Sequence, residues 1–338
     1  MKRLFVLLLS LLGSWILGLG QQPSAPFFND TSRVYVTLQG NLKALLKDTD
    51  DEDRAYHDFR FGVISTTDTA VFPVRIKTRG NYRRNMCKLP PLKLNFKKKQ
   101  VAGTILDGLD KVKLVLPCRP GKDRYNDLVK NEYLSYRLYN LLTDSSFRVR
   151  PLRIRFEDTR GKYDPFEQFG FLIEPVEVLA ERLGGEEIEG KVHPDATYTP
   201  LTSLMSVYQF LVGNTDWSIP GLHNIKLIKT DTFALPLAIP YDFDFCGLVA
   251  APYAKPNPQL GIDNVRERLY RGLCRPQPEM EAVYARLRTR REALYAEIAA
   301  QGFLSDKQRR KAAAYLDDFY DILDNDRRRQ HHFEESCR

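Results

Sequence analysis

The chain has 338 residues, enough to bury a substantial hydrophobic core in one large domain or two. With 43% hydrophobic and 28% charged residues its composition is that of a globular protein, which excludes an intrinsically disordered chain. The formal net charge of +8 fits an acidic ligand or surface, such as a nucleotide or a phosphorylated substrate.

The first twenty residues predict an export signal. Lys2 and Arg3 precede the apolar run Leu4 to Leu12, and glycines break the second apolar stretch, Trp15 to Leu19. Cleavage near Gly20 lacks a clean small-residue site, so an uncleaved N-terminal anchor is the alternative. We therefore expect an exported protein, periplasmic or extracellular, with no membrane span after signal cleavage.

After a short linker at residues 21–33, alternation of apolar and polar residues predicts strands, with one helix among them. The expected strands are Val34–Leu38, Phe59–Ser65, Phe72–Lys77, Leu92–Phe96, Lys111–Leu116, Arg150–Phe156 and Phe169–Pro175. The helix, Tyr125–Leu142, has apolar residues at helical spacing. These elements predict a strand-rich unit over residues 34–176.

Beyond residue 176 the pattern becomes mostly helical, which gives a helix-rich unit over residues 177–338 and an α+β order overall. The expected helices are Val178–Leu183, Leu201–Val212, Asp263–Leu273, Glu279–Ala300 and Ser305–Arg328. Basic runs such as Lys97-Lys98-Lys99 are interpreted as solvated faces or tails. Since no recognised nucleic-acid motif accompanies them, we expect no nucleic-acid partner.

The segment Gly213–Gly247 carries the clearest functional signal. Asp216 and Asn224 lie in a polar loop, two apolar strand-like runs follow, and Asp242 and Asp244 come directly after the second run. Carboxylates are costly to bury unless they are paired or bind a metal. A hard cation prefers oxygen ligands, and phosphoryl transfer needs an Asp for the acceptor hydroxyl with an Asn and an Asp for the metal.

These four residues suggest separate roles. Asp216 suits a catalytic carboxylate that orients or deprotonates an acceptor hydroxyl, although a turn or cap acid is the alternative. Asn224 can offer its amide oxygen to the metal, or instead close a turn. In an extended chain Asp242 and Asp244 point to the same side, and a divalent cation relieves their repulsion. His223 contacts the site or only makes a local hydrogen bond.

The sequence resembles the CotH-type kinases, an atypical protein kinase-like family named for a spore-coat protein. The resemblance rests on Asn214-Thr215-Asp216-Trp217, on His223-Asn224 and on Pro240-Tyr241-Asp242-Phe243-Asp244, with Tyr241 where Trp is usual. Upstream, Arg79-Gly80-Asn81 and Pro90 to Phe96 are similar to further family segments. The resemblance implies a two-lobed kinase-like fold, with a strand-rich N-lobe and a helical C-lobe, that binds ATP with Mg²⁺ or Mn²⁺.

A kinase-like site also needs cationic residues for the phosphates. Lys93 resembles the family's strand lysine, and Lys113 is an equally good candidate; a solvent-facing lysine is the alternative for both. Glu132 in the expected helix is the candidate partner of that lysine, Arg79 a candidate phosphate clamp, and Glu174 a candidate hinge residue near the adenine. The acceptor is an unknown protein or small molecule. No glycine-rich phosphate loop is present.

Three functions remain open. The first is an exported, metal-dependent kinase. The second is a non-catalytic envelope binding or structural module, which the seven residues between Asp216 and Asn224 favour because kinases usually have four. The third is a metal-dependent phosphoester hydrolase, which would hold two metals.

Export makes disulfides possible among the five cysteines. The pairs we expect are Cys87 with Cys118 and Cys246 with Cys274, which leaves Cys337 unpaired, although connectivity does not follow from sequence. The cysteine spacing does not fit a zinc site.

Overall fold

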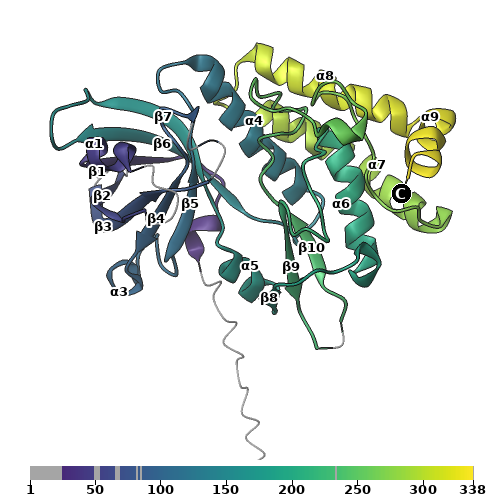
Figure 1. Ribbon diagram of the computed structural model, residues 1–338, viewed down its shortest axis with the longest axis horizontal. Coiled ribbons are helices and arrows are strands. Elements are labelled where there is room, and N and C mark those ends of the chain that lie inside the picture. The colour runs from purple at the N-terminus through teal and green to yellow at the C-terminus, as the bar shows by residue number, and fades with distance from the viewer. Residues whose placement is uncertain are drawn as a thin grey trace, which may run out of the picture.

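Seven strands from the first half of the chain close into a barrel (Figure 1). The structure, a computed structural model, describes residues 25–48, 54–64, 69–80, 83, 86–232 and 234–337, so the expected export signal lies outside the described residues. The barrel strands are β1 (Val34–Gly40), β2 (His57–Ile64), β3 (Thr69–Thr78), β4 (Leu92–Phe96), β5 (Lys111–Val115), β6 (Val149–Asp158) and β7 (Phe166–Ile173).

The barrel is a mixed sheet in the order β1-β2-β3-β4-β5-β7-β6. Neighbouring strands pair antiparallel, except for the parallel pair of β1 and β6 that closes the barrel. Alternate residues fill its interior, as in β1, where Val34, Val36 and Leu38 are buried and Tyr35 is exposed. Phe27 and Phe28, which fall in the segment expected as a linker, are buried in the same core.

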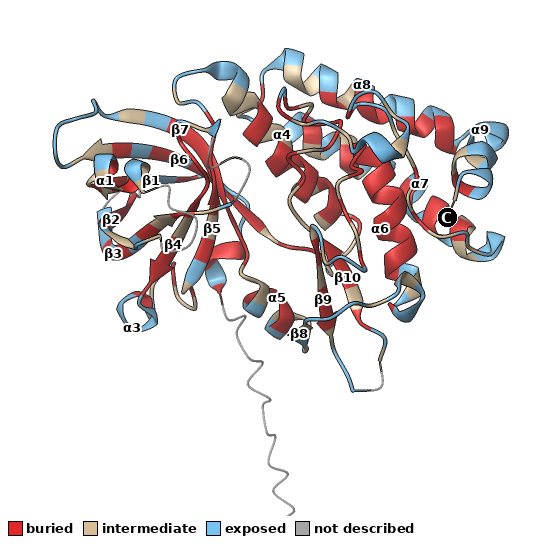
Figure 2. Cartoon of the chain, in the orientation of Figure 1, coloured by how far each residue is buried: buried red, intermediate tan, exposed pale blue. Residues whose placement is uncertain are grey.

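A second core fills the other half of the molecule. Its helices and turns are α4 (Asp123–Asn140), α5 (Val176–Arg182), α6 (Thr199–Val212), α7 (Gln277–Ala300), α8 (Asp306–Leu323), α9 (Asp326–Gln330) and the π-helical turn His331–Glu335. A small antiparallel sheet of β8 (Glu186–Ile188), β9 (Ile225–Lys229) and β10 (Leu237–Pro240) packs among them. Helix α6 is buried over almost its whole length (Figure 2), including its polar residues Thr202, Ser203, Ser206 and Gln209.

Shorter elements complete the fold. These are α1 (Leu42–Lys47), α3 (Lys98–Val101) and the 3₁₀ turns Pro26–Phe28, Pro194–Ala196 and Pro258–Leu260. Helix α1 begins at Asn41, whose side chain accepts a hydrogen bond from the Ala44 N–H at 3.0 Å. Leu42 and Leu45 then face the barrel core.

The expected two-lobed kinase-like fold with a separate helical C-lobe is wrong. The early strands form a closed barrel and not the open sheet of a separate lobe, because β1 pairs with β6 in parallel. The helices do not form a lobe of their own either. Val115, Val149 and Phe171 from the barrel strands belong to the same buried cluster as α4 and α6 to α8. Helix α4, placed by sequence in the strand-rich unit, lies at the centre of that shared core (Figure 1).

Two of the expected helices are also wrong. Residues 263–273 form turns and extended chain, and the Glu267 side chain accepts hydrogen bonds from the Asp263 and Asn264 N–H groups at 3.2 and 3.1 Å. The expected helix Ser305–Arg328 is two helices, because α8 ends at Leu323 and Asn325 caps α9.

The cysteines form two disulfides, Cys87–Cys118 and Cys274–Cys337. The first pair is confirmed, and the expected pair of Cys246 with Cys274 is wrong. Cys246 is buried in the core, where its Sγ lies 3.7 Å from the Ser135 Oγ, so it cannot reach the exposed Cys274. Within the described ranges, no helix combines the length and the hydropathy that crossing a membrane requires.

Candidate functional site

The β9–β10 hairpin brings Asn224 and Asp242 together. The two strands are antiparallel, so the residue before β9 lies beside the residues after β10. The last register pair is Ile225 with Pro240, and the Tyr241 N–H then donates to the Asn224 carbonyl at 3.0 Å. Residues that are 18 positions apart in sequence therefore meet at one end of the hairpin.

Asn224 and Asp242 both have left-handed backbone conformations, with φ of 54° and 62°. Such values are uncommon outside glycine and are retained where the surrounding structure holds them. The hydroxyl of buried Tyr136, on α4, accepts a hydrogen bond from the Asp242 N–H at 2.7 Å. The conformation of Asp242 is thus fixed from a separate element of the core.

Asp216 is held by the loop that follows α6. The helix ends at Gly213, whose φ of 67° is left-handed, and the Asn214 side chain then accepts a hydrogen bond from the Asp216 N–H at 3.0 Å. A side chain at Gly213 would collide with Tyr315 and approach Gly247, so glycine is required there. The turn directs the Asp216 carboxylate toward the hairpin.

Two neighbours orient the Asp216 carboxylate. Its Oδ1 lies 2.9 Å from the His223 Nε2, and its Oδ2 accepts a hydrogen bond from the Asn224 Nδ2 at 3.1 Å. The same Nδ2 donates to the Asp216 carbonyl at 2.7 Å. These bonds use the amide nitrogen of Asn224, so the amide oxygen is the atom with which Asn224 can bind a cation.

The four predicted polar residues meet in a cleft of about 590 Å³, a volume typical of small-molecule sites. Asp216, Asn224, Asp242 and Asp244 all line it. Its remaining lining residues are Arg79, Gly80, Arg83, Pro91, His223, Phe245, Tyr253 and Lys255. The four residues that the segment Gly213–Gly247 singled out thus lie in one cleft.

The inner wall of the cleft contains two buried carboxyl groups, from Asp244 and Glu132. Burial, followed by the charge of Asp242, raises the pKa of the Asp244 carboxyl to about 7. Burial, followed by the charge of Asp244, raises the pKa of Glu132 well above its ordinary range. Both groups therefore hold protons more tightly than ordinary carboxylic acids, although the charge of Arg83 opposes the shift in each.

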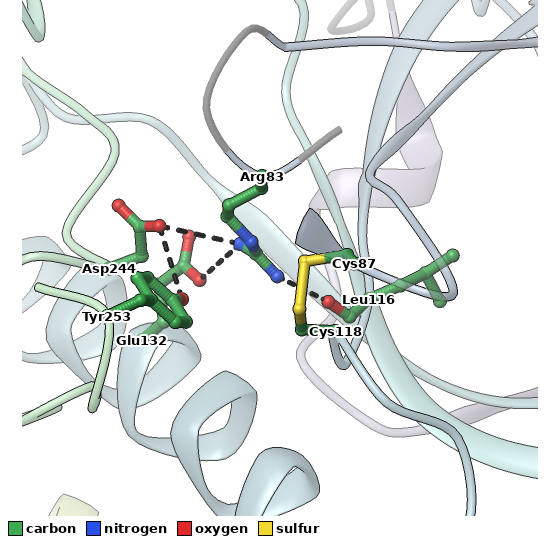
Figure 3. Close-up of a disulfide and its surroundings, with 7 residues drawn as sticks. All are labelled: Arg83, Cys87, Leu116, Cys118, Glu132, Asp244 and Tyr253. Carbon is green, nitrogen blue, oxygen red and sulfur yellow. Dashed lines mark hydrogen bonds and ion pairs between the residues drawn. A yellow bond between two sulfur atoms is a disulfide. The ribbon is translucent and has the colours of Figure 1, made fainter. Parts of the chain in front are cut away.

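One cation does lie between them. The Arg83 Nη1 is 3.6 Å from the Asp244 Oδ2 and 3.7 Å from the Glu132 Oε2 (Figure 3). The Arg83 guanidinium also lies over the Tyr253 ring, 5.8 Å from its centroid, and Tyr253 donates to Asp244 at 3.3 Å. Burial alone would lower the pKa of Arg83, but Tyr253, Asp244 and Glu132 raise it above its ordinary value.

Of the predicted phosphate-binding residues, Arg79 lines the cleft, whereas Lys113 is not among its lining residues but is near enough to Arg79 and Asp242 for their charges to affect it. The Lys113 Nζ is 4.5 Å from the centroid of the Tyr241 ring. Burial, followed by the charge of Arg79, lowers the pKa of Lys113 to about 8, and Asp242 opposes this shift. Lys93 is the register partner of Lys113 on β4, and burial followed by the charge of Lys77 lowers its pKa.

The remaining predicted residues have other surroundings. Glu132 forms an ion pair with Arg83, whereas the sequence predicted Lys93 or Lys113 as its partner. Glu174 is buried and accepts hydrogen bonds from the Arg182 Nε and Nη2 at 3.0 and 2.9 Å. It is not among the residues that line the cleft. Asn81, which belongs to the Arg79 motif, lies outside the described residues.

The donor set suits a hard divalent cation in chemical type, since Asp242, Asp244 and Asn224 supply oxygen atoms. Among the described residues, however, no three His, Cys, Asp or Glu side chains are grouped closely enough to hold a metal ion on their own. A nucleotide phosphate would have to complete such a coordination shell, as is usual for Mg²⁺.

Sequence reasoning missed three residues of the site. Arg83 and Tyr253 contact the buried acids, and Tyr136 anchors Asp242. Arg83 carried a weak signal, because it follows Arg79-Gly80 closely and precedes Cys87 by four positions. Tyr136 and Tyr253 carried none, since a buried tyrosine in a core pattern does not reveal what its hydroxyl contacts.

Comparisons with known proteins identify no family for this chain. No protein-family model matches it, and no curated protein is similar to it. The resemblance to the CotH-type kinases therefore stays a prediction, carried by short motifs, and function is inferred from the chemistry of the cleft.

Proposed function

We propose that the protein is a metal-dependent phosphotransferase that uses ATP with Mg²⁺ or Mn²⁺ and a hydroxyl acceptor, either a protein or a small molecule. The observation that carries the proposal is the convergence of Asp216, Asn224, Asp242 and Asp244 on one cleft. These residues come from two separate loops, and the left-handed backbone at Asn224 and Asp242 is held by the surrounding structure. Such strain is commonly found at functional sites.

The residues divide into an acceptor side and a phosphate side. Asp216 is half-buried, and its bonds to His223 and Asn224 fix a carboxylate that can orient or deprotonate an acceptor hydroxyl. Asp242, Asp244 and the amide oxygen of Asn224 would hold the cation, which neutralises phosphate charge when it is bound. Arg79 and Lys113 supply positive charge for the phosphates.

Lys113 is well suited to bind an anion. Its ammonium lies near Arg79, Lys226 and Lys93, and burial is the first cause of its lowered pKa. In the free protein this half-buried cation is only partly compensated, by Asp242 and by the Tyr241 ring, and a triphosphate would compensate it further. The net charge of +8 on the whole chain also favours an anionic ligand.

The protein is proposed to act outside the cytoplasm. The N-terminal twenty residues have the pattern of an export signal, and two disulfides are formed. Disulfides persist mainly in oxidising compartments.

Two other functions compete with this one. A non-catalytic binding module is favoured by the lack of a preformed three-ligand metal group among the described side chains. A two-metal hydrolase is disfavoured, because it needs more ligands than a single cation does, and the described side chains offer no group of three His, Cys, Asp or Glu for even one metal.

Nucleotide binding by the mature protein tests the proposal. Titration calorimetry with ATP in the presence of Mg²⁺, Mn²⁺ or chelator is expected to show binding that needs the cation. Binding of ATP that is the same in chelator would support the binding module instead. Release of phosphate from a phosphoester with two bound metals per chain would support the hydrolase.

A further inference from the structure

We infer that Arg83 is a built-in cation of the cleft and that the Cys87–Cys118 disulfide positions it. The inference concerns how the cleft is assembled, and only its last readout rests on the proposed phosphotransferase function.

Arg83 connects three parts of the molecule through one guanidinium. Its Nη1 is within 3.7 Å of Glu132 on α4 and of Asp244 after β10, and its Nη2 donates to the Leu116 carbonyl after β5 at 2.6 Å. Figure 3 shows the guanidinium between the acids on one side and the disulfide on the other. The cation is thus fixed at the junction of barrel and helices.

The disulfide anchors the segment from which Arg83 extends. The Cys87 N–H donates to the Arg83 carbonyl at 2.9 Å, and the Leu89 N–H donates to the Cys118 carbonyl at 3.2 Å. Cys118 is buried and follows Leu116 by two positions, so the disulfide and the Leu116 carbonyl secure the same short stretch of chain.

The surrounding acids require this cation. Asp244 and Glu132 are buried carboxyl groups, and the Arg83 Nη1 lies within 3.7 Å of both. Neither the Glu132 Oε1 nor the Arg83 Nε has a hydrogen-bond partner among the described residues. Two buried acids therefore depend on the position of one guanidinium for the compensation that burial requires.

A double-mutant cycle tests this coupling without any ligand. Arg83→Gln is combined with C87A/C118A and, as the matched control, with C274A/C337A, the second disulfide of the chain. The readout is the urea midpoint of unfolding at pH 7. In the parent, Arg83→Gln is expected to lower the midpoint, because two buried acids lose their cation, and Arg83→Lys is expected to restore part of it.

The effect of Arg83→Gln is expected to shrink to near zero in C87A/C118A and to stay undiminished in C274A/C337A. Equal effects in all three backgrounds would overturn the positioning role, and an unchanged midpoint in Arg83→Gln, or no recovery in Arg83→Lys, would overturn the cation role. If C87A/C118A does not fold, the cycle is repeated with C87V/C118A, in which valine fills part of the space that the disulfide leaves, in buffer that contains a stabilising osmolyte.

Nucleotide affinity gives the last readout. Arg83→Gln and C87A/C118A are expected to weaken Mg²⁺-ATP binding together, and C274A/C337A is expected to leave it unchanged. Loss of binding in the control as well would overturn the specific role of Cys87–Cys118. If no variant and no parent binds ATP, the proposed function fails while the ligand-free cycle still decides the role of Arg83.

Discussion

Asp244 is a single residue whose proton affects both the stability of the fold and the binding of a cation in the cleft. Its carboxyl is 6% exposed, and burial raises its pKa from 3.8 to about 7. A folded protein that holds this proton more tightly than the unfolded chain is most stable below the unfolded pKa. The contribution is lost as the pH rises toward about 7, where the folded carboxyl finally ionises.

We therefore predict that Asp244→Asn flattens the pH dependence of stability between pH 4 and pH 7. The amide resembles the protonated carboxyl, so the variant should be more stable than the parent at pH 8 by roughly 1–3 kcal/mol. Urea unfolding at several pH values measures the difference. A variant that is less stable than the parent at pH 8 would indicate that the ionised Asp244 is a net stabilising partner of Arg83.

The proton on Asp244 also competes with any cation that this residue binds. Metal-dependent nucleotide affinity should therefore rise with pH, with a midpoint near the Asp244 pKa of about 7. Calorimetry between pH 6 and pH 8 checks this. An affinity that is independent of pH over that range would place the cation away from Asp244.

At the scale of elements, strands β3, β4 and β5 align three lysines. Lys77 pairs with Lys93, and Lys93 pairs with Lys113. Like charges directly opposite in a sheet are destabilising. The flanking residues Leu92, Leu94 and Val112 are buried in the barrel, so the row lies on its outer surface, with Lys113 nearest the cleft.

Lys113→Met is expected to stabilise the ligand-free protein and weaken nucleotide binding. The pKa of Lys113 is lowered to about 8, so at pH 7 the charged ammonium costs stability, and this cost disappears as the pH rises above the folded pKa. We expect a gain of about 1–2 kcal/mol in unfolding free energy at pH 7 and a loss of about tenfold or more in ATP affinity.

Lys111→Met is the matched control, since Lys111 is exposed on the same strand. This substitution should change neither the free energy of unfolding nor the ATP affinity appreciably. If Lys113→Met destabilises the free protein, the cation–π contact with Tyr241 outweighs the repulsion within the lysine row.

The meeting of Asn224 and Asp242 at the β9–β10 hairpin follows from local sequence. Two apolar runs flanked by Asn224 on one side and Asp242 on the other require those residues to meet, because antiparallel pairing is local. The place of Arg83 in the site could not be predicted from local sequence. Its position depends on a disulfide to Cys118 and on acids from α4 and from the loop after β10, all far away in sequence.

At the scale of the whole molecule, local patterns identified all seven barrel strands but not the barrel. Its closure depends on the parallel pairing of β1 with β6, which are separated by more than a hundred residues. Alternation of apolar residues fixes which face of a strand is buried, but not which distant strand becomes its neighbour. The same limit explains why α4 was assigned to the strand-rich unit, although its buried tyrosines pack in the shared core.

The central claim is that the acids of the cleft bind a cation together with a nucleotide. Asp242 tests it most directly, because it lines the cleft and its backbone is held by Tyr136 through the main chain rather than the carboxylate. Removing the carboxylate should leave the fold intact. Asp321→Ala is the control, since Asp321 is exposed on α8.

Thermal unfolding of the parent, Asp242→Ala and Asp321→Ala, each with and without Mg²⁺-ATP, is the decisive measurement. With ligand well above its Kd, the parent and Asp321→Ala should melt about 3 °C or more higher, since binding to the folded state alone stabilises it. Asp242→Ala should melt at the parent's temperature or above without ligand and show no shift with it. If no protein shifts with Mg²⁺-ATP and Asp242→Ala melts lower throughout, Asp242 is a structural residue and the phosphotransferase account is contradicted.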